Sequence, residues 1–201
     1  MSGIALIDYG AGNLQSVFNA LKAAGASDVA VTANPAEVLA AKRIVLPGVG
    51  AFVHCMGSLS AIPGMIDALN EAVIDKGRPF LGICVGMQLM ADAGHEHGVT
   101  QGLGWIRGDV RAIAPAPALK VPHMGWNDVV PAAAHPVIEV GEAYFLHSYA
   151  FEGAHVVATT DHGGPRVAAI ARDNLLGVQF HPEKSQAYGI ATLQRFMKWR
   201  P

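Results

Sequence analysis

The sequence predicts an α/β fold with an open, mostly parallel central sheet flanked by helices, and with additional antiparallel strands in the C-terminal half. In the first half, short apolar strands alternate with amphipathic helices, as in the strand 4–7 and the helix 14–21. Strands that are apolar on both faces need helices on both sides, which favours a parallel sheet. From Trp105 onward, strand-like runs are joined by turn residues and show little helical period before Ile190.

The elements of the first half can be placed in order. The first helix carries apolar residues at i, i+3, i+4 and i+7, and Gly25 ends it. A second helix is expected to end near Gly77, where an apolar strand follows. The expected strands are 4–7, 29–32, 43–46 and 80–83, and the expected helices are 14–21 and 65–73. This repetition of strand and helix predicts right-handed crossovers between parallel strands.

The second half contains a series of strand-like runs. They read WIRGDVRAI, WNDVVP, YFLHSYAF, HVVATTDH, RVAAIARD and LLGVQFHP, and a last helix is expected at 190–199. The Pro- and Ala-rich stretch 113–120 is short enough to be a loop, and no repeat or linker divides the chain. We therefore expect one domain over residues 1–201.

Composition excludes several classes of protein. The chain has 201 residues, of which 51% are hydrophobic and 15% charged, which is typical of a protein with a buried core. The formal net charge of −2 offers no basic surface for nucleic acid. No apolar stretch is long enough to span a bilayer, and the N-terminus lacks the pattern of a signal peptide. We expect a cytoplasmic protein with free thiols at its two cysteines.

One cysteine follows an apolar strand directly, in the stretch RPFLGICVGMQLM at 78–90. Cys84 stands between Gly82 and Gly86, and helix-forming residues come next. This is the form of a nucleophile elbow, in which a sharp turn from strand to helix exposes the side chain and glycines allow close packing. Free N–H groups at the start of the helix can stabilise a thiolate and an oxyanion. Cys55 has no such setting, and we expect it to be buried and unreactive.

A catalytic thiol needs a base and a group that orients the base. His181 and Glu183 stand two apart in GVQFHPEKS, and the intervening proline favours an extended backbone that directs both side chains to one side. A surface loop with an incidental ion pair explains this spacing equally well. The stretch HEH at 95–97, near Asp92, suggests a metal site, but a solvated loop is the favoured interpretation. We expect no metal and no cofactor.

Both motifs together resemble the class I, triad-type glutamine amidotransferases. Cys84, His181 and Glu183 match the Cys, His and Glu triad of that family residue by residue. Further motifs are similar to one of its branches, the glutaminase subunits of imidazole glycerol phosphate synthase; they read DYGAGNLQSV, LPGVGAF, VPHMGWN and YFLHSY. Val85, where leucine is expected, departs from the family pattern, but its role would belong to its backbone.

The resemblance implies roles for further residues. The backbone N–H of Val85 would be one oxyanion donor, and the second would lie on the glycine-rich loop at Gly48 and Val49, where glycine allows a peptide to rotate. The residues implied to contact substrate glutamine are Gln88, Ser148 and Tyr149. The spacing alone would fit equally well if Gln88 were an ordinary polar residue of the helix with no contact to substrate.

The resemblance also implies a partner, a (β/α)₈-barrel cyclase subunit that receives ammonia and forms a heterodimer with the chain. Asn13 and Trp126 are candidates for the docking face, although Trp126 fits the core equally well. Two other classes of function stay open. A stand-alone Cys-His hydrolase could act on peptides or γ-glutamyl compounds, and a noncatalytic binding domain could keep the fold. The triad motifs also fit the glutaminase subunits of other amidotransferases.

Overall fold

The computed structural model describes residues 3–115 and 119–201, so the centre of the expected loop at 113–120 lies outside the described residues. The first half contains β1 (Ile4–Ile7), α1 (Leu14–Ala23), β2 (Val29–Thr32), α2 (Pro35–Ala40), β3 (Arg43–Gly48), α3 (Phe52–Ser60), α4 (Met65–Leu69), the π-helical η1 (Asn70–Asp75), β4 (Phe80–Cys84) and α5 (Val85–Gln88). The second half contains β5 (Ala93–Gly94), β6 (Thr100–Gln101), β7 (Gly108–Ala112), β8 (His123–Pro131), β9 (Gly141–His147), β10 (Tyr149–Gly153), β11 (Val156–Asp161), β12 (Pro165–Arg172), β13 (Leu175–Val178), the 3₁₀ turn η2 (Pro182–Lys184) and α6 (Gln186–Lys198).

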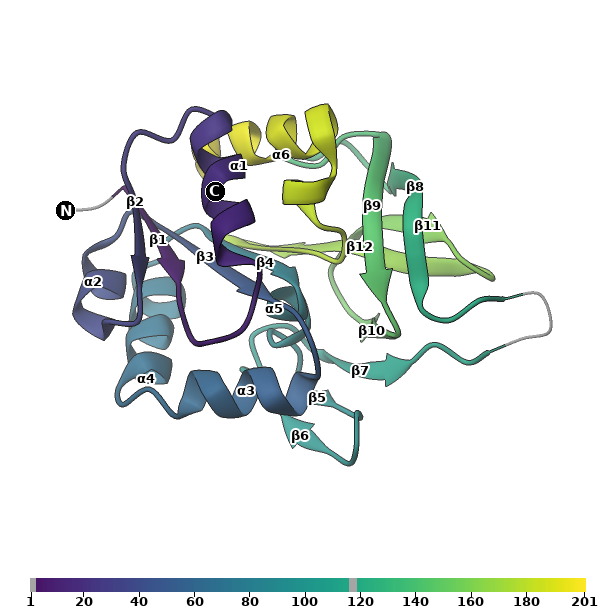
Figure 1. Cartoon of the computed structure of the whole chain (residues 1–201), viewed down its shortest axis with the longest axis horizontal. Coiled ribbons are helices and arrows are strands. Elements are labelled where there is room, and N and C mark those ends of the chain that lie inside the picture. Colours follow the sequence, from purple (N-terminus) through teal and green to yellow (C-terminus); the bar gives the residue numbers. More distant parts are fainter. Residues whose placement is uncertain (1–2, 116–118) are drawn as a thin grey trace.

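One large mixed sheet runs through the molecule in the order β2-β1-β3-β4-β13-β12-β11-β8-β9. The strands from β2 to β13 pair in parallel, and those from β13 to β9 pair antiparallel. Helices α1 and α6 lie on one side of this sheet, and α3 and α4 lie on the other (Figure 1). The predicted fold class is confirmed. The parallel half ends where β13 returns beside β4, so the C-terminal segment that follows β13 lies next to the end of β4.

The remaining strands form a small second sheet in the order β10-β7-β5-β6. Figure 1 shows its strands β5 and β6 beside the N-terminal end of α3. Since β10 follows β9 after one residue, the chain passes from the large sheet to the small one at Ser148. Close to this transition, the Leu146 carbonyl oxygen lies 3.9 Å from Sγ of Cys84 at the elbow.

The strands predicted in the first half occur at their predicted positions. Helices α2 and α3 and the two-residue strands β5 and β6 are additional elements. The last helix begins at Gln186, four residues earlier than predicted. The prediction missed the first turn because that turn is exposed on one side and carries no apolar period.

The turn between β4 and α5 is unusually tight. Cys84 has φ of 54° and ψ of −112°, a conformation that residues with a side chain rarely adopt. A Cβ added to Gly86 would lie 1.9 Å from the Leu46 carbonyl oxygen on β3, and one added to Gly82 would lie 2.6 Å from the carbonyl oxygen of Gly86. Only glycine therefore fits at either position, and the elbow packs directly on the neighbouring strand.

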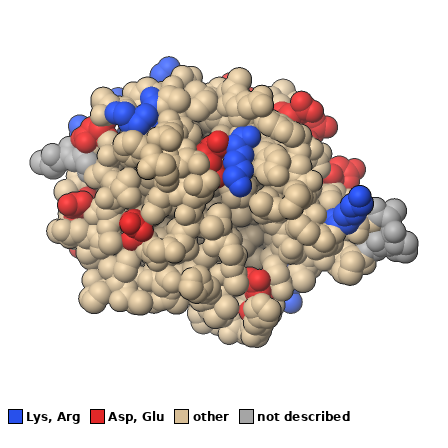
Figure 2. Space-filling model, viewed as in Figure 1, with Lys and Arg blue, Asp and Glu red and all other residues tan. Residues whose placement is uncertain are grey.

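Charged side chains are spread over the surface. Figure 2 shows lysine, arginine and acidic residues scattered over one face among uncharged ones. Among the residues that the structure describes, no single helix is long and apolar enough to cross a membrane; one sharply bent pair, Phe52–Ser60 with Met65–Asp75, passes that test of length and composition only when taken together.

Gly86→Ala tests the packing of the elbow. We expect the variant to lose at least about 2 kcal/mol of unfolding free energy, because its methyl group overlaps the backbone of β3. Gly57→Ala is the control: Gly57 lies in α3 with open space around its Cα, so alanine should leave stability unchanged or raise it by up to about 1 kcal/mol. Urea unfolding followed by circular dichroism measures both. Equal stability of the two variants would contradict the close approach.

Candidate active site

Cys84 lies at the end of β4, and α5 begins at the next residue. The residue is only 3% exposed, and its positive φ turns the side chain away from the strand direction. Two polar groups approach the sulfur. The Leu146 carbonyl oxygen lies 3.9 Å from Sγ, and Gln179 donates to Sγ from its Nε2 at 3.6 Å. The sulfur therefore faces a small polar space rather than the apolar core.

His181 follows β13, the strand beside β4, and carries an ion pair with Glu183. His181 Nδ1 lies 2.8 Å from Glu183 Oε1, and both side chains are nearly inaccessible to solvent, at 3% and 2% exposure. The backbone is fixed as well, because the His181 N–H donates to the Tyr144 carbonyl and Ser185 Oγ donates to the His181 carbonyl. Spacing in the sequence left an incidental surface pair open, and the burial of both side chains excludes it.

The environment of His181 favours its protonated form. Burial lowers its pKa, but hydrogen bonds to Cys84 and Glu183, together with the negative charges of both groups, outweigh burial and raise the pKa to about 10. At neutral pH the imidazole therefore holds a proton beside the sulfur, with Glu183 on its other nitrogen. A histidine held in this way beside a sulfur is the arrangement in which a cysteine side chain can serve as a nucleophile.

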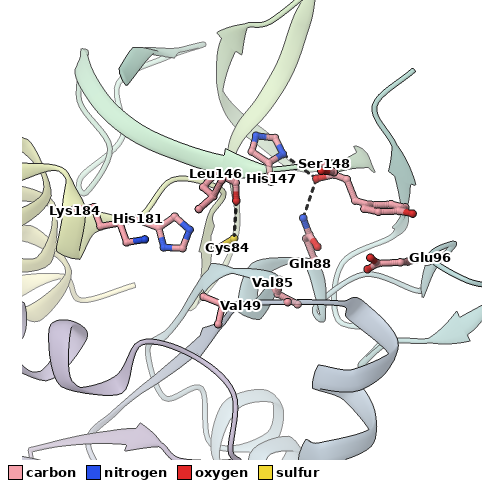
Figure 3. Close-up of a pocket in the computed structure, with 12 residues that line it drawn as sticks. Val49, Cys84, Val85, Gln88, Glu96, Leu146, His147, Ser148, His181 and Lys184 are labelled. Atoms are coloured by element: carbon pink, nitrogen blue, oxygen red, sulfur yellow. Dashed lines mark hydrogen bonds between the residues drawn. The ribbon is translucent and has the colours of Figure 1, made fainter. Parts of the chain in front are cut away.

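These groups open into a cavity of about 130 Å³. Figure 3 shows Cys84 between His181 on one side and Gln88 on the other, with Val49 and Val85 beneath. The residues that line the cavity are Val49, Gly50, Cys84, Val85, Gln88, Glu96, Leu146, His147, Ser148, Tyr149, His181 and Lys184. The volume is well below the roughly 300–1,000 Å³ of pockets for drug-sized ligands, so the cavity suits a single small metabolite.

Gln88 is held in one orientation by two acceptors. Its Nε2 donates to the Tyr149 carbonyl and to Gln179 Oε1, both at 3.0 Å. An amide nitrogen carries two hydrogens, so both are used inside the protein. The Oε1 atom of Gln88 is therefore the acceptor left to face the cavity.

A chain of buried histidines continues from Tyr149 toward β8. His147 Nδ1 donates to the Tyr149 carbonyl at 2.8 Å, so in the neutral ring Nε2 is an acceptor. His123 Nδ1 lies 3.0 Å from that atom and must donate to it, and His123 Nε2 in turn accepts from Asn127 Nδ2 at 3.0 Å. The direction of every hydrogen bond in this chain follows from one carbonyl.

The glycine-rich loop after β3 passes beside the elbow. Gly48 pairs with Cys84 in the parallel ladder. The peptide between Gly48 and Val49 is flanked by two peptides whose carbonyls accept hydrogen bonds from side chains. Tyr9 Oη donates to the Pro47 carbonyl at 2.7 Å, and Cys55 Sγ donates to the Val49 carbonyl at 3.3 Å. Burial raises the pKa of the Cys55 thiol and of the Tyr9 phenol, so both remain protonated donors.

Comparison with known proteins gives a consistent result. The family model for glutamine amidotransferase class-I matches residues 5–198. The chain belongs to the class-I glutamine amidotransferase family. It is 61% identical, over all of its length and 97% of the relative, to the imidazole glycerol phosphate synthase subunit HisH of Zymomonas mobilis. It is 50% identical to the subunit of the same name from Rhodopseudomonas palustris, covering 98% of this chain and 99% of that one.

Solved structures agree with the fold of this amidotransferase. A glutamine amidotransferase matches with a TM-score of 0.75 at 17% identity, over 98% of each chain. The glutaminase domain of CTPS from Trypanosoma brucei, solved with acivicin bound, matches with a TM-score of 0.68 at 18% identity, over 98% of this chain and 92% of that one. The resemblance noted in the sequence is confirmed.

The amidotransferase brings most of its predicted site residues together. Seven of them line the cavity: Val49, Cys84, Val85, Gln88, Ser148, Tyr149 and His181. Glu183 lies behind His181, and Gly48 lies beside Cys84 on the adjacent strand. Asn13 and Trp126 are not in the cavity lining. Both are exposed, Trp126 to 48%, so the core alternative for Trp126 is wrong.

Several residues of the cavity region were not predicted from the sequence, and three of them contribute polar groups near Cys84 or at the cavity wall. Glu96 lines the cavity, and its Oε2 accepts the N–H of Phe52, the first residue of α3. Glu96 belongs to the HEH stretch; within the described chain no group of three or more His, Cys, Asp or Glu side chains is placed to hold a metal ion. Gln179 and the carbonyl of Leu146 approach Cys84. Gln179 stood two residues before His181 in an apolar strand, and that was the signal available.

The histidine chain predicts a loss of stability in mild acid. Burial and the charges of neighbouring histidines lower the pKa of His123 to about 3, and burial lowers the pKa of His147 to about 4 despite its bond to Tyr149. The unfolded chain takes up these protons near pH 6.5 and the folded one only near pH 3–4. The unfolding free energy should therefore fall as pH decreases below about 6.5.

Urea unfolding at pH 7, 6 and 5 measures this dependence. His123→Asn removes one of the two groups and should make the fall shallower. His54→Gln, at an exposed position on α3, is the control and should keep the slope of the unchanged protein. Stability that does not change between pH 7 and 5 would contradict the neutral, buried state of the pair.

Proposed function

We propose that the chain is the glutaminase subunit of imidazole glycerol phosphate synthase, acting in the cytoplasm as one glutamine amidotransferase domain over residues 1–201. The observation that carries the proposal is the elbow cysteine facing a buried His181–Glu183 pair inside a cavity for a small metabolite. The identity of 61% to a HisH subunit over the whole chain supports the same conclusion. No cofactor is required for the reaction.

The proposed reaction begins at Cys84. Its thiolate attacks the side-chain amide carbon of glutamine, and the proton on His181 passes to the departing nitrogen, which leaves as ammonia. A γ-glutamyl thioester remains on Cys84. Water then attacks the thioester with His181 as general base, which releases glutamate and restores the thiolate and imidazolium pair. Glu183 holds His181 in the orientation and tautomer that both steps need.

The oxyanion that forms in each step needs two donors close to Cys84. Val85 is the first residue of α5, so its N–H has no partner within the helix and is available. The second donor lies on the loop of Gly48 and Val49, which is adjacent to Cys84 in the sheet. Gly48 is required there, because a Cβ would lie 2.6 Å from the Gly86 nitrogen.

The free end of glutamine binds at the opposite side of the cavity. Gln88 Oε1 is the open acceptor for its α-ammonium group, and Glu96 supplies a negative charge nearby. The segment of Ser148 and Tyr149 closes the same side. A cavity of about 130 Å³ holds one free amino acid, which favours glutamine over the peptides of a stand-alone hydrolase.

Ammonia released into water at neutral pH is protonated and no longer attacks electrophiles. A glutaminase of this kind is therefore useful only beside a synthase that takes up ammonia directly. We propose that the partner is the cyclase subunit in a heterodimer, which forms imidazole glycerol phosphate and an aminoimidazole carboxamide ribotide, a step of histidine biosynthesis. No nucleic acid or membrane is involved.

The outward face of β8 is the proposed docking face. Alternate residues of a strand share a face, and here Met124, Trp126 and Val130 are exposed to 60%, 48% and 50%. Asn13, just before α1, is exposed and its side chain makes no capping bond to the helix, so its amide is free for a partner. Exposed apolar side chains grouped on one strand are typical of an interaction surface.

Cys84→Ala tests the nucleophile. We expect glutamine-dependent synthesis by the reconstituted complex to fall by about 10⁴-fold or more, because alanine cannot form the thioester. Synthesis from ammonium salt at a pH that supplies free ammonia should be unchanged, since the cyclase is intact. Product formation with each nitrogen source is the measurement.

Cys55→Ser is the matched control. The hydroxyl keeps a donor for the Val49 carbonyl, so this variant should retain glutamine-dependent activity within about threefold. A Cys84→Ala enzyme that still used glutamine, or a control that lost it completely, would show that the elbow cysteine is not the nucleophile.

Trp126→Ala tests the docking face. A large aromatic side chain in the middle of an interface often contributes 2 kcal/mol or more, so we expect the dissociation constant for the cyclase to rise at least about 30-fold. Val99→Ala changes an exposed apolar residue in the loop before β6 and should leave affinity unchanged. Titration calorimetry with the purified cyclase compares both. Affinity unchanged in Trp126→Ala would place the interface elsewhere.

A further inference from the structure

Gln179 lies in the interior of the protein, directly below the active-site cysteine. Its side chain belongs to the segment between β13 and His181, and the residue is completely buried. Its Nε2 donates to Cys84 Sγ at 3.6 Å, and its Oε1 accepts from Gln88 Nε2 at 3.0 Å. Burying an amide is costly unless it is hydrogen-bonded, so the partners at both ends are needed to keep it there.

The orientation of this amide is determined by its neighbours. The Tyr149 carbonyl can only accept, so Gln88 must direct its nitrogen toward it. The second hydrogen on that nitrogen then points at Gln179, which must present its oxygen. The nitrogen of Gln179 is left facing the sulfur. His147 Nδ1 donates to the same Tyr149 carbonyl, which therefore accepts two hydrogen bonds.

We propose that Gln179 is a further catalytic residue of the glutaminase site, one that donates a hydrogen bond to the Cys84 thiolate and so increases the fraction of the nucleophile that is ionised. The hydrogen bond to a charged sulfur is stronger than one to a neutral thiol. His181 and Gln179 stabilise the thiolate in different ways. His181 supplies the opposite charge and takes the proton, whereas Gln179 supplies a neutral donor that no protonation change can remove.

The same contact connects glutamine binding with the nucleophile. Gln88 touches the proposed site of the glutamine α-ammonium group and also holds Gln179 in place. A substrate that is bound at Gln88 therefore rests on the same amide pair that donates to the sulfur. This inference rests on the proposed function, because it assumes that Cys84 is the nucleophile.

The test is the rate at which iodoacetamide alkylates Cys84, followed by peptide mass mapping so that Cys55 is counted separately. In Gln179→Met, which keeps the length of the side chain without a donor, alkylation at pH 7 should be about tenfold slower or more. At high pH, where the thiol is ionised in every variant, the rates should converge. A variant with a merely disturbed pocket would differ from the unchanged protein at every pH.

Two further variants sharpen the result. Gln179→Glu keeps the acceptor for Gln88 but places a carboxylate beside the sulfur, so alkylation at pH 7 should be slower still. Gln101→Met, at an exposed position on β6, is the matched control and should react like the unchanged protein. Thermal unfolding of each variant shows whether it is folded, and Gln179→Met is the milder replacement if Gln179→Glu does not fold.

The outcomes separate the inference from the proposed function. If Cys84 of the unchanged protein reacts no faster than Cys55 at neutral pH, the nucleophile itself is wrongly assigned. If Cys84 is reactive and Gln179→Met reacts at the same rate at pH 7, only the role of Gln179 is overturned. Slower alkylation at pH 7 that converges at high pH supports the hydrogen bond to the thiolate.

Discussion

The strained turn at Cys84 is the constraint on which the rest of the site depends. A residue with φ of 54° at the end of a buried strand persists only where its surroundings hold it. The surroundings of Gly82 and Gly86 leave no room for a side chain at either position, and β3 and β13 pair with β4 on its two sides. These two strands then deliver the other groups, since the glycine-rich loop continues β3 and His181 follows β13. The mixed sheet thus aligns the proposed nucleophile, base and oxyanion loop at one edge.

Beyond Cys84, His181 and Glu183, the polar interior is organised from one backbone carbonyl. Tyr149 lies just after the crossing from the large sheet to the small one, and its carbonyl accepts from both Gln88 and His147. The two branches run in opposite directions, one to Cys84 through Gln179 and one to β8 through His123. Because both histidines are neutral, the second branch keeps its direction over the whole physiological range of pH. The exposed side of β8, which carries Trp126, is backed by this chain.

How much could be predicted from the sequence depended on how local each signal was. The elbow at Cys84 is written in adjacent residues, and so are the apolar strands of the parallel half. Helix α2 also had a local signal that was missed, since Asn34 caps it and Pro35 begins it. For Gln179 the only signal was its position two residues before His181, and Glu96 had none, because their roles arise from contacts with residues 95 and 44 positions away in the chain. Trp126 could be placed on the surface only once the strand it belongs to had a known inner face.

Two side chains outside the cavity lining limit how the glycine-rich loop can move. Tyr9 holds the peptide before Gly48, and Cys55 holds the peptide after Val49, each through its carbonyl. Because the peptides on both sides are held, the peptide between Gly48 and Val49 can rotate only about the line that joins its two Cα atoms. Such a rotation exchanges the positions of one carbonyl and one N–H and requires no displacement of β3 or α3. The hydrogen bonds of Tyr9 and Cys55 therefore restrict movement of this loop to one peptide unit.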